Sequence, residues 1–225
     1  MYTTDDVINK YKARLNKSDS SDYDNLWRYQ IEETYNKGIQ DVVRRLKRGK
    51  AAENQEGDEE TRDRIDDLQV LLKEKIVSVG QYFLYVDTRP LPEDYLYYKR
   101  ITPFATKDNC KRKRIKSYLR EEANVDVLLS DWDSQPSFDF EETFHTISGN
   151  KIRIYHNKDF KVEEALLVYY KQPRFIEFEK GKPIKLEFKD DVNELMIDEG
   201  IKIMSSDLEI LNQKNLSQER IQFNN

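Results

Sequence analysis

The sequence has a single cysteine, Cys110, with seven glycines and six prolines among its 225 residues. One cysteine excludes an internal disulfide framework and fits a chain that folds in a reducing compartment. The glycines are scattered, and no GxGxxG, P-loop, GxSxG, HExxH or paired CxxC motif occurs. The sequence therefore predicts neither a catalytic site nor a cofactor.

Long apolar runs and a strong net charge are also missing. No run of about 18 apolar residues occurs, and the N-terminus, MYTTDDVINK, carries acids without an apolar stretch. We therefore expect no membrane span, no signal peptide and no membrane partner. The net charge of -5 offers no overall attraction for nucleic acid. Binding to a polyanion would need a local basic patch.

Charged and aromatic residues are abundant. Charged residues make up 36 % of the chain and hydrophobic residues 37 %, with 14 Tyr and 10 Phe. This composition can build a core, but much of the chain must be solvated face, loop or polar interface. Because aromatic side chains are favoured at protein interfaces, the composition favours a part of an assembly.

Helical periodicity dominates the N-terminal third. A first helix is predicted from Thr4, as its cap, to about Leu15. A second is predicted from Asp22 to Gly49, and a third after the charged loop 49–60, which we interpret as mobile. The second helix carries the apolar stripe Ile31, Tyr35, Ile39, Val42 and Leu46, and the third carries Ile65, Leu68, Leu72 and Ile76. The two stripes predict an antiparallel helical pair.

Strand patterns follow from about residue 80. Predicted strands cover 81–87, 95–104, 110–119, 140–147, 151–157 and 163–173, with a short helix at 121–131. Ser148-Gly149-Asn150 predicts a hairpin between 140–147 and 151–157. Alternation in 163–173 places apolar residues on both faces, so both faces should be covered.

The C-terminal part predicts one more helix and a tail. The helix opens at Asp191, carries Ile197, Ile201, Met204 and Leu208, and should return to the N-terminal helices. The predicted class is therefore α+β: an N-terminal helical hairpin packs with a C-terminal helix, around an inserted antiparallel β-sheet domain. The corresponding ranges are 1–79 helical, 80–190 β, 191–210 closing helix and 211–225 an extended arm. The arm anchors are Leu216, Ile221 and Phe223, and the alternative is a frayed tail.

Three segments carry a resemblance to a known family. They are TRPLPEDYLYYKRI (88–101), GNKIRIYHNKDFKVEEALLVYYKQPRFIEF (149–178) and DVNELMIDEGIKIMSSDLE (191–209). Together with the order of elements, they resemble the head-to-tail connector or adaptor proteins of tailed phages, most of all the ring proteins of crAss-like phages. The likeness covers 80–225, and 1–79 only by its helical plan. The charged loop 49–60 departs from a compact adaptor.

The resemblance implies a structural role in the virion. It implies a ring of about a dozen copies below the portal protein, synthesised in the host cytoplasm. Other tail or ring proteins would attach to it, and DNA would pass through its lumen without sequence specificity. No catalytic residue and no metal are implied.

A basic run followed by an acidic stretch is the main candidate contact. The basic residues are Lys111, Arg112, Lys113, Arg114, Lys116 and Arg120, and the first acids after them are Glu121, Glu122, Asp126, Asp131 and Asp133. Opposite charges on one subunit would allow head-to-tail docking with the next copy. The alternatives are a solvated strand edge, or phosphate binding by a cytoplasmic nucleic-acid-binding protein. Only Tyr118 lies in the run as a base-stacking aromatic.

Two weaker patterns are compatible with metal binding or acid–base chemistry. Asp131, Asp133, Gln135, Asp139 and Glu142 fall at calcium-loop positions. However, Pro136 stands where that loop needs glycine, so an ordinary acidic loop is predicted, with a divalent-metal enzyme as a distant alternative. His145 and His156 lie on neighbouring predicted strands, and without a placed carboxylate or cysteine partner they predict buried, hydrogen-bonded strand histidines.

Overall fold

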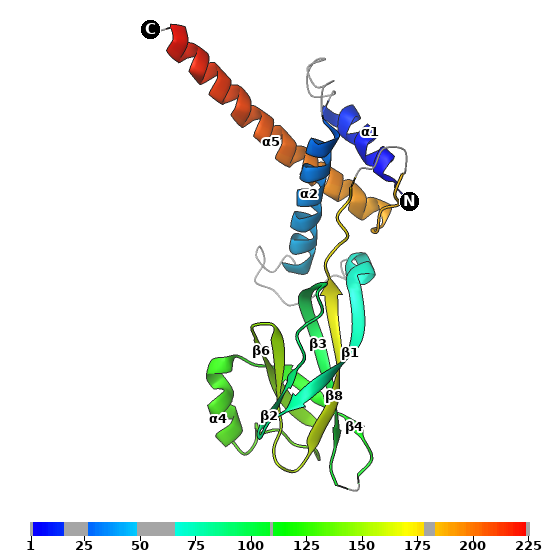
Figure 1. The fold of residues 1–225 in the computed structure, drawn as a ribbon, viewed down its shortest axis with the longest axis vertical. Helices are drawn as coiled ribbons and strands as arrows, with labels where there is room; N and C mark the ends of the chain where they lie inside the picture. The colour runs from blue at the N-terminus through cyan, green and yellow to red at the C-terminus, as the bar shows by residue number, and fades with distance from the viewer. Residues whose placement is uncertain (1, 16–26, 49–65, 109, 178–182, 224–225) are drawn as a thin grey trace. The chain divides into compact units, whose positions relative to one another are not determined.

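The computed structural model describes residues 2–15, 27–48, 66–108, 110–177 and 183–223, and it describes side chains as far as Asp207. The chain divides into two compact units. A helical unit combines Met1–Val70 with Pro173–Asn225, and a sheet unit comprises Leu71–Gln172. The structure is therefore mixed α and β, as predicted (Figure 1). The predicted mobile loop 49–60 lies outside the described residues.

The first helix, α1, spans Thr4–Leu15 as predicted, but its cap is the preceding residue. Thr3 and Asp6 form a reciprocal cap: the Thr3 backbone N–H and hydroxyl donate to the Asp6 carboxylate, and the Asp6 N–H donates to Thr3 Oγ1. Thr4 instead accepts a hydrogen bond from the backbone N–H of Ile184 at 3.1 Å. The capping side chain was therefore misplaced by one residue.

The second helix, α2, spans Arg28–Arg48 and packs on the last helix, α5, which spans Asp190–Phe223 (Figure 1). The first four residues of its predicted stripe, Ile31, Tyr35, Ile39 and Val42, are buried, which confirms the helical period. Residues 22–26 of the predicted helix lie outside the described part. The partner of α2 is α5, so the predicted antiparallel pairing with a third helix is wrong.

Two glycines set the distance between α2 and α5. A Cβ built on Gly38 would lie 2.6 Å from the backbone oxygen of Met196 and 3.0 Å from the backbone nitrogen of Gly200. A Cβ on Gly200 would lie 1.8 Å from Tyr11 Oη, and Tyr11 itself is fully buried. The two helices thus cross backbone against backbone, at a separation that only glycine permits.

The predicted third helix is a strand from Leu72 onwards. Residues 66–68 are helical and Gln69–Leu71 form a 3₁₀ turn, but β1 spans Leu72–Gln81. A spacing of four residues fits a strand as well as a helix, because four is also a multiple of the strand period of two. The pairing of β1 with β8, from Leu72 opposite Tyr170 to Ser78 opposite Glu164, decides between them. Ile65 lies outside the described part.

The sheet unit is one eight-stranded sheet in the order β4-β3-β8-β1-β2-β7-β6-β5. All neighbours are antiparallel except β5 and β6, which are parallel. The other strands span Tyr85–Thr88 (β2), Tyr95–Thr106 (β3), Lys113–Arg114 (β4), Lys116–Leu119 (β5), Glu142–Ser148 (β6), Lys151–Tyr155 (β7) and Lys161–Lys171 (β8). The β6–β7 hairpin is confirmed, with Ser148 opposite Lys151 and Gly149 at φ 58°. The inserted sheet therefore starts at residue 72 instead of 80.

The sheet is nearly closed because its first and last strands are consecutive in the chain. Only Ile115 separates β4 from β5, and its side chain is fully buried. The Ile115 N–H donates to Pro103 at one edge, and the Lys116 N–H donates to Glu141 at the other. The enclosed core includes Val86, Ile101, Ile115, Ile152, Ile154, Val162, Ala165 and Leu167. Both faces of β8 are covered, as predicted.

A short helix covers part of the outer face of the sheet. A 3₁₀ turn, η4, spans Glu122–Asn124, and α4 spans Val125–Ser130, as predicted for this stretch. Val125 packs with Phe144 and Tyr155, whose rings stack at 4.8 Å. This second cluster fixes the start of the acidic stretch against β6 and β7.

The last helix is longer than predicted. The backbone of α5 stays helical to Phe223, so the extended conformation predicted for 211–225 is wrong over 211–223. After Gly200 the sequence has no glycine or proline, the two residues that most disfavour helix propagation. The side chains of Leu216, Ile221 and Phe223 lie outside the described part.

An ion-pair network joins α1 to α5. Lys10, Arg14 and the Tyr2 hydroxyl all donate to the Glu194 carboxylate. Burial alone would raise the pKa of Glu194, but these hydrogen bonds outweigh it and lower the pKa to about 2. The ionised Glu194 carboxylate thus helps to hold α1 against α5, and this contribution to stability is complete when the pH is above 4.5, the ordinary pKa of the group. No helix among the described residues is long and apolar enough to span a membrane.

Candidate interaction surfaces

The basic segment, residues 111–120, contains β4 and β5, which are the two edge strands of the sheet. Arg112 pairs with Glu164 at 2.6 Å, and Lys113 pairs with Glu141 at 2.9 Å. Within the described part of the chain, the other cations of the segment have no ion pair; they are Lys111, Arg114, Lys116 and Arg120. The segment therefore keeps cationic side chains on an exposed surface.

An aromatic ring that the sequence pattern missed supports this segment. The guanidinium carbons of Arg112 and Arg114 lie 4.5 and 5.6 Å from the centre of the Phe104 ring. Phe104 belongs to β3 and stands opposite Arg114 in the sheet. A search confined to the run itself finds only Tyr118, because Phe104 joins it through strand pairing alone.

The predicted acidic residues lie on η4, on α4 and in the loop that follows. Glu122 pairs with Arg153 at 3.2 Å. Asp131 accepts hydrogen bonds from the Asp133 N–H and the Ser134 hydroxyl, so it shapes the loop. Glu121, Asp126 and Asp133 are exposed and have no ion pair with a described residue. Two of the five predicted acidic residues are thus engaged within their own unit.

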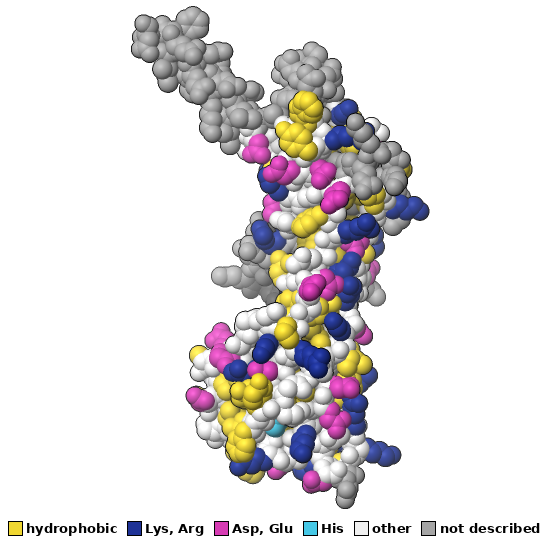
Figure 2. All heavy atoms as spheres, in the orientation of Figure 1, with side chains coloured by type: hydrophobic (Ala, Val, Ile, Leu, Met, Phe, Trp, Pro, Cys, Tyr) yellow, Lys and Arg dark blue, Asp and Glu magenta, His cyan; other side chains and the backbone are white. Residues whose placement is uncertain are grey.

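The basic segment and the acidic stretch adjoin within the sheet unit. Lys116 stands opposite Glu142 in the parallel β5–β6 pair. Lys107 also pairs with Asp139 at 3.4 Å, at the end of the same loop. On the face shown in Figure 2, basic and acidic side chains are interspersed, with no large patch of one sign. Part of the predicted charge complementarity is consequently satisfied inside one subunit.

The acidic loop has the geometry of an ordinary turn. Asp131 caps its start, Ser137 bridges to Glu142, and strand β6 follows where a calcium loop would have its exiting helix. No group of three metal-ligating side chains is found among the described residues. The loop instead presents the most exposed large apolar side chains of the described part, Trp132 at 84 % and Phe140 at 82 %.

Both histidines are buried, but neither is fully hydrogen-bonded. Ser117 Oγ lies 2.7 Å from His145 Nδ1, and His156 Nδ1 lies 2.9 Å from the Asn157 carbonyl. Nε2 of each ring is buried without a partner, so the expectation of satisfied strand histidines is only half correct. Burial lowers the pKa of His145 to about 4. No carboxylate contacts either ring, so the pair offers no acid–base relay among the described residues.

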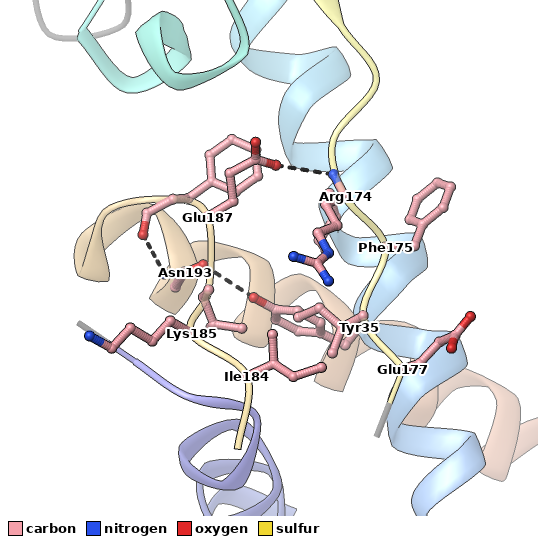
Figure 3. A pocket seen from close by; sticks show the side chains of 12 residues that line it. Tyr35, Arg174, Phe175, Glu177, Ile184, Lys185, Glu187 and Asn193 are labelled. Atoms are coloured by element: carbon pink, nitrogen blue, oxygen red, sulfur yellow. Dashed lines mark hydrogen bonds between the residues drawn. The ribbon is translucent and has the colours of Figure 1, made fainter. Parts of the chain in front are cut away.

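The helical unit contains a pocket between α2, α5 and two connecting segments (Figure 3). Its volume is about 230 Å³. Tyr35 donates to Asn193 at 3.2 Å, and Asn193 donates to the Phe188 carbonyl at 2.8 Å, so the floor is satisfied internally. The described lining contains no His, Cys or Ser, and its charged side chains are Arg174, Glu177, Lys185 and Glu187.

A shallower groove runs along the outer side of α2. It has a volume of about 490 Å³. We name it the α2 groove and define it by its lining, which is Tyr29, Glu32, Glu33, Asn36, Lys37, Gln40, Phe175, Ile176 and Glu177. Asn36 fixes one wall, because its side-chain amide both donates to and accepts from the backbone of Ile176 at 3.0 Å. Sequence periodicity missed this groove because one wall is an irregular segment.

The chain was compared with known proteins. It matches no protein-family model, and it matches no curated protein. The geometry of its own surfaces is therefore the basis for the functional argument.

Proposed function

We propose that this chain is a structural subunit of the head-to-tail connector of a tailed phage. In this proposal, copies of the chain form a ring of about a dozen below the portal protein. DNA passes through the lumen, and other tail or ring proteins attach to the ring. The proposal assigns the chain no catalytic role, no cofactor and no metal, and it places the protein in the virion.

The exposed aromatic side chains carry this proposal. Trp132, Phe140 and Phe83 are 84, 82 and 71 % exposed on the sheet unit. Trp27 and Tyr29 are 66 and 62 % exposed on the helical unit. Tyr and Trp are enriched at the centres of protein interfaces, where they supply most of the binding energy. Their presence on both units supports an assembly in which each copy has contacts through each unit.

The proposal predicts self-association. We expect native mass spectrometry and electron microscopy of the purified protein, alone and with the portal protein of its phage, to show closed rings of one size. Trp132→Ala should weaken this assembly, whereas Ile147→Ala, a partly exposed strand position, should leave it unchanged. Monomers that persist at high concentration with portal present would remove the proposal.

A nucleic-acid-binding protein is the second candidate. The four cations of the basic segment without an ion pair in the described part favour it. This function predicts that DNA affinity falls steeply with salt, and that Lys111→Ala with Lys116→Ala reduces the slope by about two. Fluorescence anisotropy with a labelled duplex would measure both. A slope unchanged by the two substitutions would exclude this function.

A further inference from the structure

We propose that Trp132 of one copy inserts into the helical-unit pocket of a second copy, with Asp133 facing Arg174. The inference rests on the proposed assembly, and it names one contact that joins two copies. The pocket is the one between α2, α5 and two connecting segments (Figure 3). The loop and the pocket each lie within a single unit, so the match depends only on the chemistry of each.

The pocket is suited to an apolar ring. Its volume is about 230 Å³. A protein cavity of about 150 Å³ can hold benzene, so this pocket has room for an indole. The polar groups of its floor already bond to each other, because the Tyr35 hydroxyl donates to Asn193. An incoming ring therefore leaves neither group without a partner. The apolar side chains of the lining include Ile39, Ile184, Leu186 and Phe188.

Arg174 gives the pocket a preference for a carboxylate beside that ring. Figure 3 shows the Arg174 guanidinium directed towards Tyr35 and Asn193, whereas the Glu177 carboxylate points away. The Arg174 side chain has no hydrogen bond or ion pair with a described residue. The Glu187 carboxylate instead accepts the backbone N–H of Arg174, at 3.1 Å. A guanidinium that is free in a partly enclosed site favours a carboxylate as its partner.

The loop around Trp132 presents such a ring and such a carboxylate together. Trp132 is 84 % exposed. Asp133 follows it, is exposed, and its carboxylate has no hydrogen bond or ion pair with a described residue. On the other side, Asp131 accepts from the Asp133 N–H and from the Ser134 hydroxyl. These bonds hold the loop in shape before it binds, which lowers the entropy that docking costs.

The other highly exposed rings of the sheet unit fit the pocket less well. Both acids that flank Phe140 are paired with lysines of the same unit, at 3.4 and 2.9 Å. Phe83 is 71 % exposed, but the Lys158 ammonium lies 4.8 Å from the centre of its ring. Docking Phe83 would bring that cation towards Arg174, and like charges repel. Trp132 is therefore the ring that best matches both the pocket and its charge.

The size of this contact sets the expected effect of removing it. An aromatic side chain buries roughly 150–250 Å², whereas a stable interface buries roughly 800 Å² per partner. Trp132 is thus an anchor within a larger interface. Its loss should weaken the association of copies without abolishing every contact between them.

Reversal of the charge pair tests the inference. Asp133→Arg alone and Arg174→Glu alone should each weaken assembly about tenfold, as measured by mass photometry over a concentration series. A chain that carries both substitutions should recover assembly, because each reversed loop then meets a reversed pocket. Asp126→Arg reverses another exposed acid without an ion pair in the described part and should assemble as the unmodified chain does. Circular dichroism should show that all four variants fold. A double variant that assembles no better than the single variants would overturn the pairing.

A peptide tests the pocket without the ring. The probe is a fluorescent peptide with the sequence of residues 128–137, LLSDWDSQPS. Its partner is the full-length Trp132→Ala chain, whose own loop cannot fill the pocket. Fluorescence anisotropy should show at least tenfold tighter binding than for a peptide that carries Trp132→Ala, and Arg174→Glu in the chain should remove this difference.

The two measurements separate failure of the contact from failure of the ring. If the unmodified chain forms closed rings but does not distinguish the two peptides, the pocket is wrong and the ring stands. If the unmodified chain stays monomeric with portal present, the ring proposal fails. Peptide binding in that case would assign the pocket to Trp132 of its own chain, which also overturns the contact between copies.

Discussion

Replacing Gly38 with alanine is expected to lower the free energy of unfolding of the helical unit by about 2 kcal/mol. The added Cβ would lie 2.6 Å from the backbone oxygen of Met196, and a backbone atom cannot rotate away as a side chain can. The α2 and α5 helices must therefore separate, which loosens the packing around their buried side chains, such as Ile39 and Ile197. The strain outweighs the gain of about 1 kcal/mol in helix propensity.

A matched glycine makes this prediction specific. Gly80 lies in strand β1, and a Cβ there would meet nothing closer than 3.9 Å. Urea unfolding, followed by far-ultraviolet circular dichroism, should show a lower midpoint for Gly38→Ala and little change for Gly80→Ala. A Gly38→Ala variant as stable as the unmodified chain would mean that the helices do not cross at this distance.

The sequence predicts where the helices lie better than it predicts which helices pack against each other. The stripe of α2 follows from local spacing, because Ile31, Tyr35, Ile39 and Val42 recur at the helical period. The predicted return of the C-terminal helix to the N-terminal helices agrees with the packing of α5 on α2, but the closeness of that crossing depends on two glycines 162 positions apart in the sequence numbering. No periodicity records such a contact.

Strand β1 shows that local spacing can also predict the wrong type of element. Leu72 and Ile76 fit the helical stripe that was predicted to begin at Ile65, and only long-range pairing with β8 makes them part of a sheet. In contrast, the β6–β7 hairpin was predictable because its turn chemistry is local. Local turn chemistry therefore predicted the hairpin, while β1 and the nearly closed sheet depend on long-range pairing, including the edge pairing through Ile115.

The candidate surfaces were predictable only in part for a related reason. The charge of residues 111–133 can be read from the sequence, but its partial neutralisation by Glu141 and Glu164 requires the folded sheet. The α2 groove could not be found from spacing, because Phe175 and Ile176 reach it from an irregular segment that Asn36 holds in place. Trp132 is distinguished from the other aromatic residues by its exposure, which the sequence of the acidic loop does not reveal.

Acidification from pH 7 to pH 4 is expected to destabilise the sheet unit by about 3 kcal/mol through His145. Its side chain is fully buried, between Ser117 and the ring of Tyr98, whose centre lies 5.2 Å away. Burial lowers its pKa from 6.5 to about 4. Between these two pH values His145 is therefore protonated in the unfolded chain but not in the folded chain. The stability present above pH 6.5 is lost as the pH falls towards 4, and the loss levels off below that.

Two further substitutions isolate this effect. His145→Leu should flatten the slope between pH 6.5 and 4, whereas His156→Gln, at the other buried histidine, should keep the part carried by His145. Glu194 acts in a different window, because its pKa is lowered from 4.5 to about 2 and its contribution is lost only below pH 4.5. Hydrogen exchange read separately for β6 and α5 would distinguish the two units. A slope in β6 that survives His145→Leu would assign the sensitivity to another group.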